Sequence, residues 1–150
     1  MRKEEIVNVL QSMAREWFGS SQQNIIHAEI LRDKGLNKLA DKFQEEGNEE
    51  FEEAQKVIKR IIELGGNLTV SISDFPIIYD VKELIEYMYN TTENGIKELS
   101  NIASQLNDDF ITLNLINEFI LGEKEHNDWL RKDIKLIELI GIENYILEQL

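Results

Sequence analysis

One helical run, residues 39 to 64, constrains this chain more than any other stretch, because the side that it should bury has an acidic middle. Positions taken alternately four and three residues apart fall on the side of a helix that faces its neighbours in a bundle. This seam is apolar at both ends and passes through Glu46, Glu50 and Glu53 at its centre. Carboxylates are rarely buried unless they are paired or bound to a metal. The run therefore predicts a bundle helix with an ionic site at mid-length.

A second run, near the C-terminus, shows the same pattern. Its seam is apolar on both sides of Glu123 and His126, which are three residues apart and therefore share one face of a helix. Two facing helices that each place such a pair in the core have the ligand arrangement of a carboxylate-bridged dimetal site. We therefore expect Glu50, Glu53, Glu123 and His126 to converge in one layer and to bind at least one divalent metal ion.

The composition limits the kinds of protein that this chain can be. Its 150 residues are the size of one domain, so we expect a single domain over residues 1–150. The net charge of −13 argues against a general nucleic-acid binder and suits a surface or cavity that attracts cations. The lack of cysteine excludes disulfides, thiolate metal sites and iron–sulfur clusters. No apolar run approaches the ~18 residues of a membrane span, and the first residues lack an apolar signal core, so we expect a cytoplasmic protein.

Four long helical runs and one aperiodic stretch define the expected fold. Glycines mark the helix ends, at Gly35, at Gly65 and Gly66, and at Gly141. The expected helices run from about Lys3 to Lys34, from the Gly35 turn to about Leu64, from Val81 to Gln105, from the turn at 107–109 to about Ile140, and from Ile142 to Leu150. The stretch from Asn67 to Asp80 contains Pro76 and loses the helical period, which indicates a long surface crossover. This pattern predicts an all-α, ferritin-like four-helix bundle with a crossover between helices two and three and a short fifth helix.

Two C-terminal strings carry a resemblance to a known family. The string Glu123-Lys-Glu-His-Asn-Asp-Trp-Leu130 and the later Gly141-Ile-Glu-Asn-Tyr-Ile146 are similar to the bacterioferritin patterns Glu-x-x-His-x-Asp-Trp-Leu and Gly-x-x-Asn-Tyr-Leu. Glu50-x-x-Glu-Ala54 and Leu64-x-Gly-x-Leu68 follow the same family without gaps. The resemblance covers nearly the whole chain and is weakest in the crossover and the third helix.

The resemblance implies a hollow homo-oligomeric cage with a di-iron ferroxidase centre in each subunit and ferric mineral stored inside. Glu50, Glu123 and His126 match ligands of the family. Glu53 stands where the family has a histidine, and a carboxylate there still suits iron or manganese. The family's haem-binding methionine aligns with Phe51, which offers no axial ligand, so we expect no haem.

Two positions depart from the family pattern. The glutamate ligand of the first helix falls on Trp17, and that of the third helix falls on Thr92. A glutamate lies one residue away in each case, at Glu16 and Glu93, which is about 100° around the helix. Either these helices are rotated so that both glutamates become ligands, or the site lacks its bridging carboxylates. For these two residues an ordinary surface role is slightly preferred.

Each proposed ligand also has a simpler interpretation. The run from 45 to 53 could be a solvated acidic face, and Glu123 with His126 could be an ion pair. The shared position of these pairs at mid-helix favours metal, more for Glu50 than for Glu53. His27 has no acidic partner at ligand spacing, so it is interpreted as a core histidine.

Three functional hypotheses follow from the resemblance. The first is a haem-free, bacterioferritin-like protein that binds Fe(II), oxidises it with O2 or H2O2 and stores Fe(III). The second is a ferritin-like shell or metal-binding protein with a degenerate, non-catalytic site, which Trp17 and Thr92 favour. The third is a mini-ferritin that protects DNA against peroxide. That family uses first-helix histidines and only His27 is available, so it ranks last. Whether the chain is a ferroxidase stays open at this point.

Overall fold

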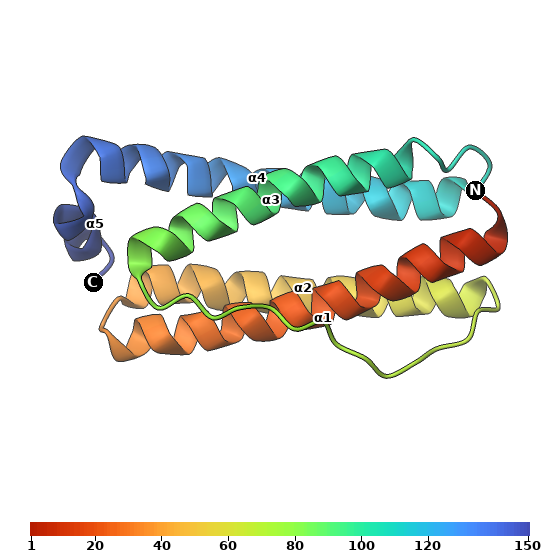
Figure 1. The fold of residues 1–150 in the computed structure, drawn as a ribbon, viewed down its shortest axis with the longest axis horizontal. Coiled ribbons are helices and arrows are strands. Elements are labelled where there is room, and N and C mark those ends of the chain that lie inside the picture. Colours follow the sequence, from red (N-terminus) through yellow and green to blue (C-terminus); the bar gives the residue numbers. More distant parts are fainter. The chain divides into compact units, whose positions relative to one another are not determined.

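The computed structural model describes residues 1–150 and contains five α-helices and no strand (Figure 1). The helices are α1 (Lys3–Asp33), α2 (Asn37–Glu63), α3 (Val81–Ala103), α4 (Phe110–Ile140) and α5 (Ile142–Glu148). The predicted all-α fold is confirmed, and each helix ends within a few residues of its expected position. The chain divides into two compact units, which are described one at a time: Met1–Ile77 with Gln149–Leu150, and Ile78–Glu148.

The first unit is a hairpin of α1 and α2 with the crossover packed against it. The turn between the helices is tight because Gly35 adopts a φ of 82°, which glycine tolerates best. Leu36 at the start of α2 provides no side-chain cap, and the carbonyl oxygen of Gln149 accepts a hydrogen bond from the Lys38 N–H at 3.0 Å instead. Apolar side chains are buried at the expected three- and four-residue spacing in both helices, at Ile6, Leu10, Met13, Ala28, Leu31, Leu39, Phe43, Val57 and Ile61.

The two helices of this hairpin are closely packed at Gly47. A Cβ atom at that position would lie 2.9 Å from Cγ1 of Ile25 and 3.0 Å from the backbone oxygen of Ser21. Ser21 Oγ also donates a hydrogen bond to the Gly47 carbonyl oxygen at 2.6 Å. The missing side chain therefore lets the middle of α2 approach the polar middle of α1.

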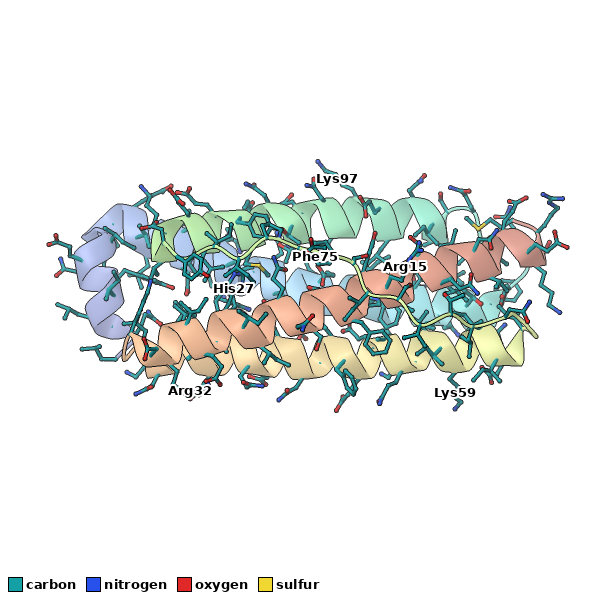
Figure 2. All side chains as sticks on the ribbon, turned by 60° about the horizontal axis from the view of Figure 1, so that its bottom comes forward. Arg15, His27, Arg32, Lys59, Phe75 and Lys97 are labelled. Atoms are coloured by element: carbon teal, nitrogen blue, oxygen red, sulfur yellow. The ribbon has the colours of Figure 1, made fainter.

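The crossover runs beside α1 and has no helix or strand, as predicted. The Ser73 N–H donates to the Arg15 carbonyl oxygen at 3.0 Å, and Gln23 Nε2 donates to the Pro76 carbonyl oxygen at 2.7 Å. Because both bonds follow the same order along the two segments, the crossover runs parallel to α1. Figure 2 labels Arg15 and Phe75 in this region. Gly19 makes the contact close, since a Cβ atom there would lie 2.2 Å from the Ser73 carbonyl oxygen.

The second unit consists of α3 and α4, with α5 packed against α4. Both long helices begin with an aspartate cap: Asp80 accepts from the Glu83 N–H and Asp109 from the Thr112 N–H, each at 3.0 Å. Gly141, with a φ of 82°, separates α4 from α5. Tyr145 holds α5 in place, because its ring is buried and its hydroxyl donates to Oδ2 of Asp133 at 2.6 Å. None of the five helices combines the length and the apolar character that a membrane span requires.

Candidate metal centre

The acidic run of α2 divides between interior and surface. Glu46 and Glu50 are each only 4% exposed, whereas Glu45, Glu49 and Glu52 face solvent. Glu53, the other predicted ligand on this helix, is half-buried. The helix therefore carries buried carboxylates on its seam and a solvated acidic face beside them, and metal binding by the buried ones stays a prediction.

Glu50 is in contact with the polar middle of α1. Asn24 Nδ2 donates a hydrogen bond to Oε1 of Glu50, and the Ser20 hydroxyl also hydrogen-bonds to this carboxylate. Ser20 and Asn24 are four residues apart and lie on one face of α1. Burial nevertheless raises the pKa of Glu50 to about 7, since these two bonds only partly offset the loss of hydration. The carboxylate therefore lacks the positive charge that a buried anion requires.

In the second unit, Glu123 occupies space that a glycine leaves open. Its side chain is buried on α4, and a Cβ atom at Gly95 of α3 would lie 3.1 Å from Glu123 Oε2. His126, one turn further along α4, is half-buried, and its Nδ1 lies 4.0 Å from Glu123 Oε1. The predicted pair thus shares one side of the helix with its carboxylate directed towards α3.

The third-helix position that departs from the family pattern is part of a polar contact between α3 and α4. Asn127 Nδ2 donates to Glu93 Oε1 at 2.8 Å and to Thr92 Oγ1 at 3.1 Å. The Thr92 hydroxyl donates in turn to the Tyr89 carbonyl oxygen at 2.8 Å. Hydrogen bonds from Asn127 and from the Tyr89 hydroxyl lower the pKa of Glu93, so this carboxylate is ionised at neutral pH.

The first-helix position that departs from the family pattern, Trp17, is less buried than Thr92 on α3. Trp17 is half-buried and Glu16 is exposed on α1. Met13 and Ala14, one turn before Trp17, are buried, whereas Trp17 itself stays partly exposed. The bulk of the indole explains the difference, because a tryptophan at the edge of a seam leaves part of its ring exposed.

The predicted ligand set takes residues from both units. Neither unit by itself brings three or more aspartate, glutamate or histidine side chains together as a ligand set. The convergence of Glu50, Glu53, Glu123 and His126 therefore remains a prediction, as do the roles of Glu16 and Glu93.

His27 and Phe51 have structural surroundings that fit their simpler interpretations. His27 is fully buried, and its ring meets the Phe43 ring edge to face, with centroids 6.1 Å apart. Burial lowers the pKa of His27 to about 4, so the imidazole is neutral inside the protein. Phe51 is 48% exposed and packs edge to face on Phe18. The phenyl ring of Phe51 offers no axial ligand to haem, and the absence of haem stays a prediction.

Sequence reasoning missed four residues that shape these surroundings: Gly47, Asn24, Gly95 and Asn127. The sequence of α1 is polar around Asn24, but the partner of Asn24 on another helix could not be predicted from spacing within α1. Asn127 lies four residues after Glu123, and it is more deeply buried than His126. Considering the residue four positions after Glu123, as well as the one three positions after it, would have identified Asn127.

Two long helical hairpins, an extended crossover between them in sequence and carboxylates buried at mid-helix are together typical of the ferritin-like class of all-α proteins. Residues 7–140 match the family described as "Ferritin-like domain", and the chain belongs to that family.

Curated relatives agree with this assignment. The chain is 33% identical over 132 residues to a bacterioferritin of Brucella melitensis, covering 85% of this chain and 81% of the relative. It is 27% identical over 149 residues to a bacterial ferritin of Neisseria meningitidis serogroup B, with coverage of 97% and 96%. A bacterial ferritin of Synechocystis is 28% identical over 154 residues, with coverage of 99% and 97%. The resemblance found in the sequence is thus confirmed, and it supports iron storage at the level of the family.

Proposed function

We propose that the protein is an iron-storage and iron-detoxifying ferritin of the bacterioferritin type that works without haem. Fe(II) binds to Glu50, Glu53, Glu123 and His126, is oxidised there and passes as Fe(III) into the acidic interior of a cytoplasmic cage built from many copies. The observation that supports this most is the burial of Glu50 at mid-helix in a chain of the ferritin-like family.

The donor atoms of these residues suit the proposed substrate. Carboxylate oxygens and imidazole nitrogens are accepted by Fe(II) and Mn(II). A bound cation would relieve the unfavourable burial of the Glu50 carboxylate and displace the proton that this group carries below about pH 7. Two Fe(II) ions supply two electrons, which reduce O2 to H2O2, or H2O2 to water, with the protons taken from solvent. The side chains of this protein hold and orient the iron during that transfer.

A second function is supported by a specific observation, namely the state of the two glutamates that would have to replace the missing ligands. Glu16 is exposed, and Glu93 is hydrogen-bonded to Asn127 and Tyr89. If Glu16 stays at the surface and Glu93 keeps these hydrogen bonds, the site would lack bridging carboxylates. The protein would then be a shell that binds a single divalent metal ion and oxidises iron slowly or not at all.

Anaerobic calorimetry with Fe(II), followed by exposure to air, distinguishes these functions. Wild type is compared with the double variant Glu50→Ala/His126→Ala and with the control Glu52→Ala/Glu125→Ala, which removes two exposed carboxylates from the same helices. We expect the first variant to lose ~10-fold or more in affinity and the control to bind as wild type does. Equal binding by all three proteins would refute the proposed site.

The oxidation step is measured on the same samples by the appearance of ferric absorbance. Oxidation by wild type well above the rate in buffer, and its loss in Glu50→Ala/His126→Ala, supports the ferroxidase. Tight binding with no rate above buffer supports the non-catalytic shell. Sedimentation tests the cage separately, since a single species of 17.5 kDa at micromolar concentration would contradict it.

A further inference from the structure

Asn24 has an unusual set of contacts for a fully buried side chain. It lies on α1 with none of its surface exposed. Its Nδ2 donates to Glu50 Oε1, but its Oδ1 is buried and accepts no hydrogen bond. A buried amide oxygen without a donor is unfavourable, and few such atoms occur in folded proteins.

The orientation of this amide follows from its neighbour. Turning the side chain over would place Oδ1 against an oxygen of the Glu50 carboxylate, which cannot donate a proton when it is ionised. The bond to Glu50 thus fixes the nitrogen and leaves the oxygen without a donor. A cation that binds oxygen ligands would supply the missing partner of this oxygen.

The Glu50 carboxylate also lacks a positively charged partner. The carboxylate is buried, and the two groups of α1 that bond to it, Ser20 and Asn24, are both neutral. Gly47, one turn before Glu50, holds α2 close to α1 at this level. Asn24, whose amide oxygen has no donor, therefore contacts a buried carboxylate on which no positively charged side chain acts. Asparagine oxygens and carboxylates are together the ligands that hard divalent ions take.

We propose that Asn24 is a metal ligand, which supplies Oδ1 from α1 to the divalent ion that Glu50 binds. This inference rests on the proposed function, and it gives the first helix a ligand although Trp17 offers none. Because the amide is neutral, it contributes one negative charge fewer than a glutamate would. The site then favours Fe(III) over Fe(II) less strongly than one completed by a carboxylate.

Calorimetry of the full chain with Mn(II) alone tests the role of Asn24. Asn24→Ala removes the oxygen, Asn24→Asp keeps an oxygen and adds a charge, and Gln22→Ala is a control on the exposed side of α1. We expect Asn24→Ala to weaken Mn(II) binding by ~10-fold or more and Gln22→Ala to leave it unchanged. Asn24→Asp should bind Mn(II) at least as tightly as wild type. Asn24→Ser, which also shortens the side chain but stays polar, replaces the alanine variant if that one does not fold.

Two outcomes overturn the proposal. Unchanged affinity in Asn24→Ala would make the residue a packing residue only. Affinity in Asn24→Asp as low as in Asn24→Ala would show that only the Nδ2 donation to Glu50 matters. The rise in melting temperature caused by Mn(II) provides a second readout for every variant.

Glu50→Gln and Glu123→Gln separate this proposal from the proposed function. If both variants bind Mn(II) as wild type does, the proposed metal site itself is wrong. If they bind weakly and Asn24→Ala does not, the site stands and Asn24 is not one of its ligands.

Discussion

The side-chain amide of Asn127 on α4 donates two hydrogen bonds to neighbouring residues of α3, to Glu93 Oε1 at 2.8 Å and to Thr92 Oγ1 at 3.1 Å. A single buried amide thus satisfies both residues at the point where the ferritin pattern leads one to expect a glutamate ligand. The contact fixes the rotation of α3 against α4 and keeps Glu93 ionised.

Replacing Asn127 by alanine should destabilise the second unit. The variant loses both bonds and leaves a void at a buried position, so we expect a loss of about 1–3 kcal/mol. Chemical denaturation followed by circular dichroism measures it, with Asn114→Ala on the exposed side of α4 as the control. A change no larger than that of the control would mean that the two bonds contribute nothing net.

Gly47→Ala should destabilise the α1–α2 hairpin although alanine is the better helix former. The new methyl group would meet Ile25 Cγ1 at 2.9 Å and the Ser21 backbone at 3.0 Å, so we expect a net cost of about 1–3 kcal/mol. Metal affinity should fall as well, because Glu50 lies one turn away. Thermal unfolding and Mn(II) titration measure both effects against Glu45→Ala, an exposed substitution on the same helix. A stabilised variant with unchanged affinity would show that the helices are not closely packed there.

Glu50→Gln should change stability and metal binding in opposite directions. Burial raises the pKa of Glu50 to about 7, so the metal-free protein bears a cost for ionising it that grows as the pH rises from 4.5 through 7. The amide avoids this cost, and at slightly alkaline pH the metal-free variant should gain about 1–3 kcal/mol. Its stabilisation by Mn(II) should be largely lost. The control Glu52→Gln, on the exposed face of α2, should show neither effect. If Glu50→Gln changes stability and Mn(II) binding no more than this control does, the Glu50 side chain is exposed to solvent.

His27 should make stability depend on pH in the reverse sense. Its pKa falls from 6.5 to about 4 on folding, so between these values the unfolded chain binds more protons and stability rises with pH. The contribution is complete above about pH 6.5 and is lost as the pH falls towards 4. Because Glu50 has the opposite slope, the difference between wild type and His27→Gln is the diagnostic quantity.

That difference in unfolding free energy should increase by about 2–3 kcal/mol from pH 4 to pH 6.5 and then stay level. Urea denaturation at a series of pH values measures it. A difference that is independent of pH would mean that His27 titrates alike in the folded and unfolded protein.

The sequence by itself determined the helices, their ends and the level of the candidate site. Apolar side chains every three or four residues, glycines at 35, 65 and 141, and the loss of period around Pro76 are local signals, and each one limits the backbone directly. The burial of Glu50 could also be predicted from the sequence, because Glu50 lies between Phe43 and Val57 on the same side of the helix and that side is buried.

Only the tertiary structure decided which polar side chains meet. The pairing of Asn24 with Glu50 and of Asn127 with Glu93 depends on the rotation and axial offset of two helices, which spacing within one helix does not fix. A rotation of about 100° exchanges neighbouring positions, so residues at the edge of a seam, such as Trp17 and Glu53, were uncertain. Close packing at Gly47 and Gly95 helps to set these rotations, because a Cβ atom would lie 2.9 Å from Ile25 Cγ1 at the first position and 3.1 Å from Glu123 Oε2 at the second.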